Sequence, residues 1–307
     1  MLDIKNNYSL ANITTLKIGG SAKKFVAVEN LDELIEAIKF ARDNNLEFLV
    51  VGGGSNLLIS DSGVNKLIIQ NKFSGIQQEG NILKVKSGTI LKDLINYSIQ
   101  LGLSGLQNLS GIPGTVGGAV YGNAGAYGQT ISEHLIQITA FNGNNEENFT
   151  RDECSFDYRY SEFKKNHYTI LEISFELEPS TEELLSTQSQ EILEKRLVKY
   201  PTGIKCPGSF FKNIVASTLP QEIAEKLKDK IVYGKLPAGS LLESVGAKGA
   251  TLGDIEIAPY HANLFINKGR GTAEDFYKLA KKYAELVKEK FGITLEPEVQ
   301  LINLPKI

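Results

Sequence analysis

Apolar residues along the first hundred positions alternate between helical and strand-like spacing. Residues 30–45 begin with an asparagine suited to an N-cap and then repeat apolar residues every three or four positions, which predicts a helix. Residues 47–60 hold two short apolar runs separated by three glycines, which predicts a strand, a tight turn and a second strand. A strand at 81–89 and a helix at 89–103, ended by Gly102, repeat the alternation.

The second part of the chain continues the mixture of strands and helices. The long helix near the C-terminal end begins with Thr272, which forms a capping-box pattern with Asp275, and ends at Gly292. The polar helix at 180–200 is interpreted as a crossing between domains. Together these patterns predict an α+β fold with several layers. The expected strands lie at 135–143, 168–179 and 293–302, and the expected helices at 180–200, 219–230, 238–249 and 271–292.

Composition narrows the class of protein. With 307 residues the chain can form two or three domains, and its 33 basic and 36 acidic residues give no basic excess for nucleic acid or a membrane surface. Because the chain has neither a long apolar run nor a basic leader followed by an apolar stretch, we expect it to be cytoplasmic. Cys154 and Cys206 are too few for a disulfide framework and fit a reducing compartment. No metal site is expected, since the histidines lack ligand spacing: His134, His167 and His261.

Glycines crowd into residues 109–129. Flexible linkers are also glycine-rich, but they carry serine and polar residues, whereas this stretch carries Ile112, Val116 and Val120. Because glycine costs conformational entropy, this density indicates positive φ angles or a very close approach of the backbone to another group. We therefore expect an ordered, buried segment that packs against either protein or a ligand. Its glycines are Gly111, Gly114, Gly117, Gly118, Gly122, Gly125 and Gly128.

A second glycine segment, GGGSN at residues 52–56, could bind an anion. Successive backbone N–H groups can converge on an anion there, and Ser55 and Asn56 add side-chain donors. An ordinary hairpin turn explains the same residues equally well. A dinucleotide fingerprint is excluded because its third glycine position is Leu57. Two anion-capable segments in one nearly neutral chain suggest an elongated cofactor with a pyrophosphate.

Three short stretches carry polar residues capable of chemistry, and each has an ordinary structural explanation. Arg159 lies in DYRYSEFK, where a solvated strand edge is the more common explanation for an isolated arginine. Ser209 follows a Pro-Gly corner in PGSFFKN and could simply cap a helix. Glu296 and Glu298 in LEPEVQ lie two apart on a predicted strand, where paired carboxylates usually face solvent. The residues alone leave these alternatives open.

Eight motifs in series resemble the UDP-N-acetylenolpyruvoylglucosamine reductase family: TTLKIGGSAKKF, VGGGSNLLISD, GIPGTVGGAVYGNAGAYG, DYRYSEFK, GSFFKN, AGSLLESVGAKG, HANLFINKG and LEPEVQLI. The resemblance extends from about residue 12 to residue 302. It implies an α+β, three-domain FAD-binding fold of the PCMH/vanillyl-alcohol-oxidase-like type with a C-terminal substrate domain. The implied domains are FAD-binding subdomain 1 at 1–70 plus 297–307, FAD-binding subdomain 2 at 71–198 and a substrate-binding domain at 199–296.

The resemblance implies FAD as a non-covalent cofactor held by the two glycine segments, with NADPH as co-substrate. Backbone donors suit a diphosphate because its charge is spread over several oxygens. The implied FAD-binding residues are Gly52, Gly53, Gly54, Ser55, Asn56, Pro113, Gly114, Gly117, Gly118, Asn123, Ala124, Gly125 and Tyr127. The residues implied to hold the UDP portion of the substrate are Tyr158, Lys199 and Asn213.

The implied reaction reduces UDP-N-acetylglucosamine enolpyruvate to UDP-N-acetylmuramate, a step in peptidoglycan and cell-wall synthesis. Hydride arrives at the vinyl C3, and negative charge then develops on C2 and the carboxylate. Arg159 matches the family's carboxylate partner, and Glu298 matches the donor that helps to stabilise the enol-like intermediate. Ser209 matches the residue that protonates C2.

The chain departs from the family at several points near these residues. Arg159 and Ser209 are separated by about 50 positions, which resembles the shorter, type II-like subclass. Residues 201–208 are longer than the usual segment before the serine. Ile214 replaces a usual proline, and Gln300 stands where a basic residue is common. These changes concern local geometry and flavin contacts, and the reaction itself is expected to be unchanged.

Two other functions share some of these features. An FAD-dependent oxidase of the wider vanillyl-alcohol-oxidase-like fold would have the glycine segments without needing GSFFKN or LEPEVQ. A non-catalytic nucleotide-binding relative would be expected to lose Arg159, Ser209 or Glu298, and all three are present. The expected partner is therefore a small-molecule substrate of a monomeric enzyme, with no nucleic acid and no membrane.

Acid precipitation tests the expected non-covalent attachment of FAD. Flavin-linked relatives attach the cofactor through histidine or cysteine in the region that residues 109–129 occupy, and this stretch contains neither. Yellow flavin should therefore appear in the supernatant after the protein is precipitated with acid. Colour that stays in the washed pellet would contradict this expectation.

Overall fold

The computed structural model describes residues 2–166 and 168–307 and divides the chain into two compact units. Each unit is described by itself, and His167 lies outside the described residues. The three-domain division expected from the sequence stays a prediction. Unit 1 consists of Met1–Tyr8, Ala22–Gly53 and Asn65–Tyr200. Unit 2 consists of Ser9–Ser21, Gly54–Val64 and Pro201–Ile307.

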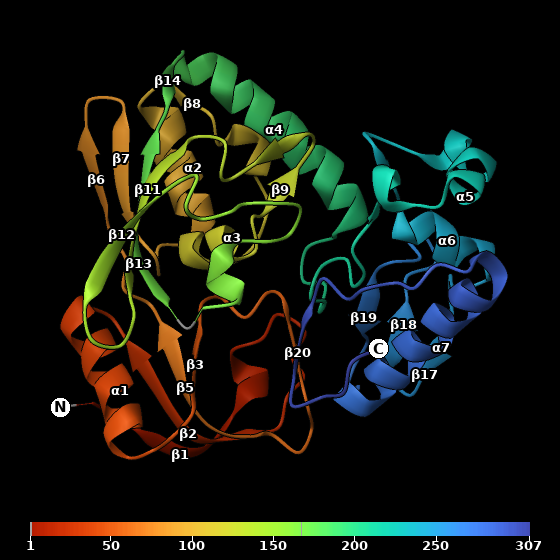
Figure 1. Ribbon diagram of the computed structural model, residues 1–307, viewed down its shortest axis with the longest axis horizontal. Coiled ribbons are helices and arrows are strands. Elements are labelled where there is room, and N and C mark those ends of the chain that lie inside the picture. Colours follow the sequence, from red (N-terminus) through yellow and green to blue (C-terminus); the bar gives the residue numbers. More distant parts are fainter. Residues whose placement is uncertain (1, 167) are drawn as a thin grey trace. The chain divides into compact units, whose positions relative to one another are not determined.

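A four-stranded sheet and helix α1 (Leu31–Asp43) form one layer pair of unit 1 (Figure 1). The predicted N-cap is confirmed, because Asn30 Oδ1 accepts a hydrogen bond of 2.9 Å from the Glu33 N–H. The helix buries Leu34, Ala37, Ile38 and Ala41, which share one face, against the sheet. In sheet order the strands are β1 (Lys5–Ser9), β2 (Ser21–Val28), β5 (Val64–Asn71) and β3 (Phe48–Val51).

A five-stranded antiparallel sheet forms the rest of unit 1 with helices α2, α3 and α4. Its central strand β13 is buried along nearly its whole length, which explains the continuous apolar run in its sequence. In sheet order the strands are β12 (Glu146–Thr150), β11 (Leu135–Phe141), β13 (Thr169–Glu176), β7 (Ile82–Lys86) and β6 (Ile76–Glu79). The helices are α2 (Leu91–Gln100), α3 (Val116–Tyr121) and α4 (Glu182–Lys199).

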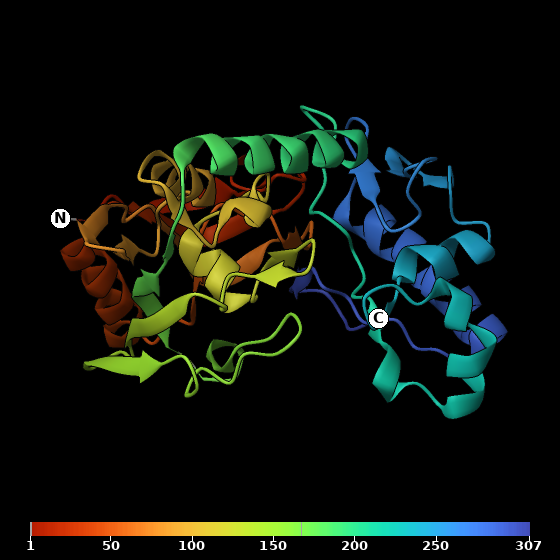
Figure 2. The same cartoon turned by 90° about the horizontal axis from the view of Figure 1, so that it is seen from above.

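Helix α4 is a single uninterrupted helix that lies across α2 and the 3₁₀ turn η2 (Gln107–Leu109) of the same unit (Figure 2). Thr181 caps it, since its hydroxyl oxygen accepts a hydrogen bond from the Leu184 N–H. Polar contacts hold it as well, including one of 2.8 Å between the hydroxyls of Ser110 and Ser189. The helix thus packs within unit 1, and the boundary between the units falls directly after it.

Unit 2 is built around an aromatic cluster beneath helix α7 (Ala273–Phe291). Phe276 of this helix contacts Phe210 and Phe265, with ring centroids 5.0 and 5.1 Å apart. Gly292 ends α7 at a φ of 69°, as its position in the sequence predicts. The other elements of the unit are α5 (Gln221–Lys226), α6 (Ala238–Ser244) and the sheet of β17 (Thr251–Leu252), β18 (Ile255–Ile257) and β19 (Phe265–Asn267).

The strands on either side of GGGSN do not pair with each other. β3 pairs in parallel with β5, whereas β4 (Leu57–Ile59) pairs in parallel with β20 (Gln300–Ile302). The hairpin explanation of this segment is therefore wrong, because the chain passes from one sheet into another. The remaining short elements are β8 (Leu103–Ser104), β9 (Gly125–Ala126), β10 (Gln129–Thr130), β14 (Glu178–Pro179), β15 (Ile214–Val215), β16 (Lys235–Leu236), η1 (Leu10–Asn12), η3 (Glu162–Lys164), η4 (Ala216–Thr218) and η5 (Lys228–Lys230).

Both cysteines are buried free thiols. Burial raises the pKa of the Cys154 thiol to about 12, with a further contribution from the Glu153 carboxylate. Burial also raises the pKa of Cys206. Within the described ranges, no helix has the length and apolar character required to cross a membrane.

Removing the carboxylate of Asp61 should destabilise unit 2. Asp61 follows β4, and its two oxygens accept hydrogen bonds of 2.9 and 3.0 Å from the N–H groups of Ala273 and Glu274 at the start of α7. Because a capping group of this kind contributes about 1–2 kcal/mol, Asp61→Ala should lower the free energy of unfolding in urea by that amount. Asp152→Ala, which removes an exposed acid from a turn of unit 1, is the matched control. Equal stability of the two variants would contradict the assigned role.

Candidate active site

The second glycine segment contains a helix that the sequence pattern does not predict. Helix α3 begins after Thr115, whose hydroxyl oxygen accepts a hydrogen bond of 3.3 Å from the Gly118 N–H. Val116 and Val120 lie one turn apart and are fully buried, so tertiary packing stabilises a helix that its two glycines disfavour. Burial of this apolar face compensates for weak helix propensity.

Most glycines of the two segments are required by neighbouring protein atoms. A Cβ at Gly52 would collide with Thr115 Oγ1, and one at Gly53 would lie 2.8 Å from the Gly114 Cα. At Gly117 a Cβ would lie 2.8 Å from the Ser87 Cβ. The two glycine segments therefore pack directly against one another and against the sheet. At these positions, therefore, the bare backbone closely approaches other protein atoms.

Gly118 is different, because no protein atom accounts for it. It is exposed on α3, and a Cβ built there would meet only Thr115 Oγ1 at an ordinary 3.4 Å. Its backbone is helical and has no positive φ angle. Glycine within a helix costs roughly 0.5–1 kcal/mol relative to alanine. An unexplained glycine on an exposed helix face fits the close approach of a bound ligand.

Asn123 supplies a buried acceptor in the same segment. The residue is 5% exposed and adopts a left-handed φ of 42°. Its Nδ2 donates a hydrogen bond of 2.9 Å to the Asp157 carbonyl, whereas its Oδ1 has no hydrogen-bond partner among the described residues. A buried acceptor left unsatisfied costs about 1–3 kcal/mol. A ligand that donates a hydrogen bond, such as a flavin, would remove that cost, so the segment fits FAD.

The side chain of Arg159 is hydrogen-bonded to this glycine segment. Its Nη2 donates a hydrogen bond of 3.0 Å to the Gly125 carbonyl, and its Nη1 donates one of 3.5 Å to the Asn123 carbonyl. The residue is half-buried in a turn, and its φ of 55° lies in the left-handed region. The alternative of a solvated strand edge is therefore wrong. Strained backbone that holds a charged group at a glycine-rich segment is typical of functional sites.

Ser209 begins an extended segment of unit 2. It forms a β-bridge with Leu264, and no helix follows it, so the N-cap explanation is wrong. The next two residues are fixed by one asparagine. The Phe210 N–H donates to the Asn263 carbonyl at 3.0 Å, and the Phe211 N–H donates to Asn263 Oδ1 at 2.8 Å. The backbone at Ser209 is therefore held rigidly.

Glu298 lies on the segment next to Ser209. The N–H groups of Glu298 and Val299 both donate to the Phe210 carbonyl, at 2.7 and 3.4 Å, which is a bulge. The predicted strand 293–302 is therefore too long, and only Gln300–Ile302 forms a regular strand, because Pro297 has no N–H and the bulge follows it.

Glu296 and Glu298 have different environments and do not act as a pair. The Glu296 carboxylate is exposed and forms an ion pair of 3.2 Å with Lys212. Glu298 is half-buried, and its carbonyl accepts a hydrogen bond of 3.1 Å from Asn56 Nδ2. Unit 2 thereby brings together Ser209, Glu298 and the end of the GGGSN segment.

The other residues predicted to bind ligand lie at separate places in the two units. Asn213 Oδ1 accepts a hydrogen bond of 3.2 Å from the Ala238 N–H at the start of α6, so this side chain also has a structural role. Lys199 lies in the last turn of α4, 5.2 Å above the Tyr200 ring. Tyr127 is half-exposed between β9 and β10, with a φ of 51°. The Arg159 guanidinium lies 5.4 Å from the Tyr158 ring.

The segment before Ser209 is anchored despite its unusual length. The Cys206 carbonyl accepts a hydrogen bond of 2.8 Å from the Thr15 hydroxyl, and the Lys205 carbonyl accepts one of 2.9 Å from the Asn267 N–H. Gln300 pairs through its N–H with the Asn56 carbonyl at 3.0 Å. The departures from the family pattern therefore lie in an ordered part of unit 2.

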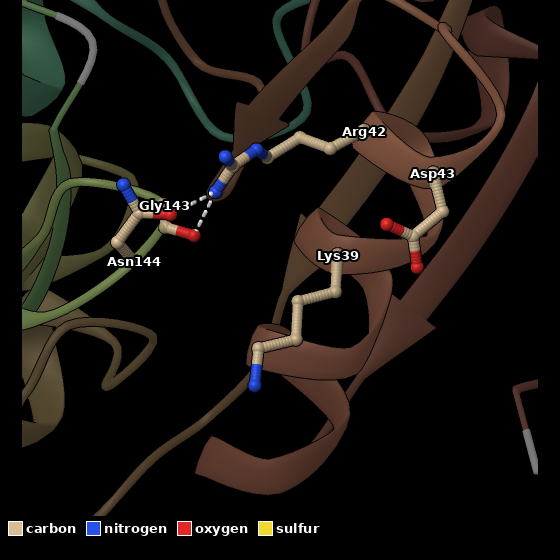
Figure 3. Close-up of a pocket in the computed structure, with 5 residues that line it drawn as sticks. All are labelled: Lys39, Arg42, Asp43, Gly143 and Asn144. Carbon is tan, nitrogen blue, oxygen red and sulfur yellow. Dashed lines mark hydrogen bonds between the residues drawn. The ribbon is translucent and has the colours of Figure 1, made fainter.

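A shallow surface pocket of unit 1 lies between α1 and the turn that joins β11 and β12 (Figure 3). Arg42 crosses it and donates hydrogen bonds to the Gly143 carbonyl and, at 2.8 Å, to Asn144 Oδ1. Lys39 and Asp43 complete the lining. None of the residues implied in catalysis lines this pocket, and its arginine joins two elements of the fold. In residues 2–166 and 168–307 no cluster of three metal-ligating side chains occurs.

Comparison with known proteins identifies the family. Residues 200–302 match the model described as UDP-N-acetylenolpyruvoylglucosamine reductase, C-terminal domain, and residues 22–147 match an FAD binding domain. A UDP-N-acetylenolpyruvoylglucosamine reductase of Solibacter usitatus is 39% identical over 305 residues, which cover 98% of this chain and 97% of that protein. The chain belongs to the UDP-N-acetylenolpyruvoylglucosamine reductase family.

Other relatives agree with this assignment. UDP-N-acetylenolpyruvoylglucosamine reductase 2 of Bacillus cereus (strain ATCC 14579) is 34% identical over 99% of this chain and 94% of its own length. The crystal structure of the reductase from Thermus caldophilus covers 98% of this chain and 100% of its own, with a TM-score of 0.80 and 28% identity. The family confirms the predicted α+β FAD-binding fold and the flavoenzyme class, with FAD as cofactor and NADPH as reductant. It favours the reductase over the oxidase and the non-catalytic relative.

A pair of glycine substitutions in α3 separates packing from ligand contact in this reductase. Gly118→Ala should raise the stability of the apoprotein by up to about 1 kcal/mol, because alanine is the better helix former. It should also weaken FAD binding by about tenfold or more, if the added methyl lies where the cofactor approaches. Urea unfolding and flavin fluorescence titration measure the two effects.

Gly117→Ala is the matched control, because its methyl would meet Ser87 inside unit 1. This variant should lose apoprotein stability. Unchanged FAD affinity in Gly118→Ala would remove α3 from the cofactor site.

Proposed function

We propose that this chain reduces UDP-N-acetylglucosamine enolpyruvate to UDP-N-acetylmuramate with Arg159, Ser209 and Glu298 as its catalytic residues. The observation that supports the roles of Ser209 and Glu298 is the bulge at the Phe210 carbonyl, which fixes their two segments side by side. We further propose that the enzyme acts as a monomer in the cytoplasm, without nucleic-acid or membrane partners. The product is a precursor for peptidoglycan.

Bound FAD supplies the redox chemistry, because it can take hydride from NADPH and deliver it to C3 of the enolpyruvyl group. The protein's part is to hold and orient the cofactor. Gly118 leaves room on α3, and Asn123 Oδ1 offers a buried acceptor. The remaining proposed FAD residues are Gly52, Gly53, Gly54, Ser55, Asn56, Pro113, Gly114, Gly117, Ala124, Gly125 and Tyr127.

Arg159 binds the carboxylate of the substrate in this proposal. A guanidinium presents parallel N–H groups that match the two oxygens of a carboxylate. The hydrogen bonds to the Asn123 and Gly125 carbonyls fix the guanidinium plane before substrate binds. A preorganised cation of this kind stabilises the negative charge that spreads from C2 to the carboxylate after hydride arrives at C3.

Ser209 donates the proton that C2 requires. A serine hydroxyl is a weak acid in water, so the step depends on the strong basicity of the carbanion-like carbon and on a fixed hydroxyl position. Asn263 provides that rigidity through its bonds to the two residues that follow Ser209. Glu298, on the neighbouring segment, helps to stabilise the developing enolate. Tyr158, Lys199 and Asn213 bind the UDP portion of the substrate.

Ser209→Ala should separate the two halves of the reaction. Reduction of FAD by NADPH needs no proton at C2 and should stay near normal. Oxidation of the reduced flavin by the enolpyruvyl substrate should slow by about 10²-fold or more, the usual contribution of a positioned general acid. Ser209→Cys should retain more activity than the alanine variant, since a thiol can still deliver a proton. Stopped-flow absorbance of the flavin follows both half-reactions.

Ser217→Ala is the control, because Ser217 is an exposed serine of the same unit. Both of its half-reactions should match the native enzyme. A fast oxidative half-reaction in Ser209→Ala would remove Ser209 from the mechanism and leave proton delivery to Glu298 or water.

A further inference from the structure

Arg196 is a charged residue to which the proposed function assigns no role. It lies in the last turn of α4 and is half-buried. Its Nε is buried and has no hydrogen-bond partner among the described residues. Its guanidinium lies 5.1 Å from the Tyr200 ring, and Tyr200 is the residue that follows the helix. A buried donor on a cationic group, packed against an aromatic ring, is costly without an anionic partner.

The glycine-rich segment approaches Arg196 closely. A Cβ at Gly111 would lie 3.0 Å from the Arg196 Cδ and 3.1 Å from its Nε, so the segment's first glycine leaves room for this side chain. Burial lowers the pKa of the Arg196 guanidinium, the phenols of Tyr200 and Tyr127 oppose that change, and the Arg159 charge lowers the pKa further. Arg196 therefore lies against Gly111, at the start of the glycine-rich segment that is implied in FAD binding.

Burial of the Arg196 guanidinium and its unsatisfied Nε carries a cost in the absence of ligand. An anion beside Arg196 would relieve that cost, and a guanidinium fork matches phosphate oxygens. The glycine segments provide uncharged donors alone, and Arg159 is assigned to the carboxylate. A diphosphate in this region would still need a cation.

We propose that Arg196 is a ligand-binding residue that contacts the diphosphate of a bound nucleotide. The proposal rests on the proposed function, because it places the nucleotide ligand at the same site. Diphosphates are present in both FAD and the UDP-sugar, and the structure assigns the shared chemistry to Arg196. Contact of Arg196 with either the FAD diphosphate or the UDP diphosphate would support the proposal.

Binding measurements on Arg196→Gln test this role. Affinities for FAD and for UDP are measured by fluorescence titration and calorimetry, and at least one of them should fall about tenfold or more, the effect expected when a charged hydrogen bond is lost. Arg196→Lys should fall between the native protein and Arg196→Gln, because lysine keeps the charge without the fork. Lys195→Gln removes an exposed cation from the same turn and should leave both affinities unchanged.

Thermal unfolding of the apoprotein distinguishes ligand binding from a structural role. Without ligand, Arg196→Gln should be as stable as the native protein or more stable, because it removes a buried charge. Inorganic pyrophosphate should raise the melting temperature of the native apoprotein and not that of Arg196→Gln. This probe needs no turnover, so failure to reduce the enolpyruvyl substrate would count against the proposed function and not against this one.

Three results would overturn the proposal. The first is an affinity for both FAD and UDP within twofold of native in Arg196→Gln. The second is an equal response of both apoproteins to pyrophosphate. The third is a loss confined to the enolpyruvyl substrate, with FAD and UDP unaffected, which would assign Arg196 to the carboxylate instead.

Discussion

The close approach of bare backbone is the constraint on which the candidate site of unit 1 depends. Gly53 packs against Gly114 at a distance that leaves no room for a Cβ, and Gly117 packs against Ser87 in the same way. These contacts fix helix α3 and the loop that follows it. The loop in turn holds Arg159 through two carbonyls, so the guanidinium of the proposed catalytic arginine is oriented by backbone whose close packing requires glycine.

Unit 2 fixes the residues of its part of the candidate site in another way. Instead of close glycine packing, it uses one carbonyl, that of Phe210, which accepts two hydrogen bonds from successive residues of the opposite segment. The bulge interrupts the strand and turns Glu298 away from the exposed position that Glu296 occupies. Buried phenylalanines beneath the two segments make this arrangement rigid. The strand irregularity is thus part of how the site is built.

Apolar periodicity and capping residues predicted the helices that are stabilised by contacts between residues close in sequence. Helices α1 and α7 follow from apolar periodicity and from the caps Asn30 and Thr272, and the structure confirms both. Helix α3 was missed because its glycines disfavour a helix that distant contacts stabilise. The roles first considered for Arg159 and Ser209, a solvated edge and a helix cap, were wrong because distant contacts fix both segments. Arg159 bonds to Gly125, 34 positions away, and Phe211, in the segment of Ser209, bonds to Asn263, 52 positions away. The resemblance of the motifs assigned expected roles to both residues, which periodicity could not do, and those roles stay predictions.

The nearly neutral charge of the chain is compatible with the proposed way of binding nucleotides. Backbone N–H groups in the glycine segments can hold phosphate oxygens without adding cations, so a nucleotide-binding protein can have a net charge of -3. Neutral donors cannot balance charge that is buried with a ligand, however, and a few fixed cations must do so. Arg196 has a buried Nε without a hydrogen-bond partner among the described residues, which carries a cost in the apoprotein. Such a cost is expected where a site is preorganised for an anion, because the free energy lost in folding is recovered when the anion binds.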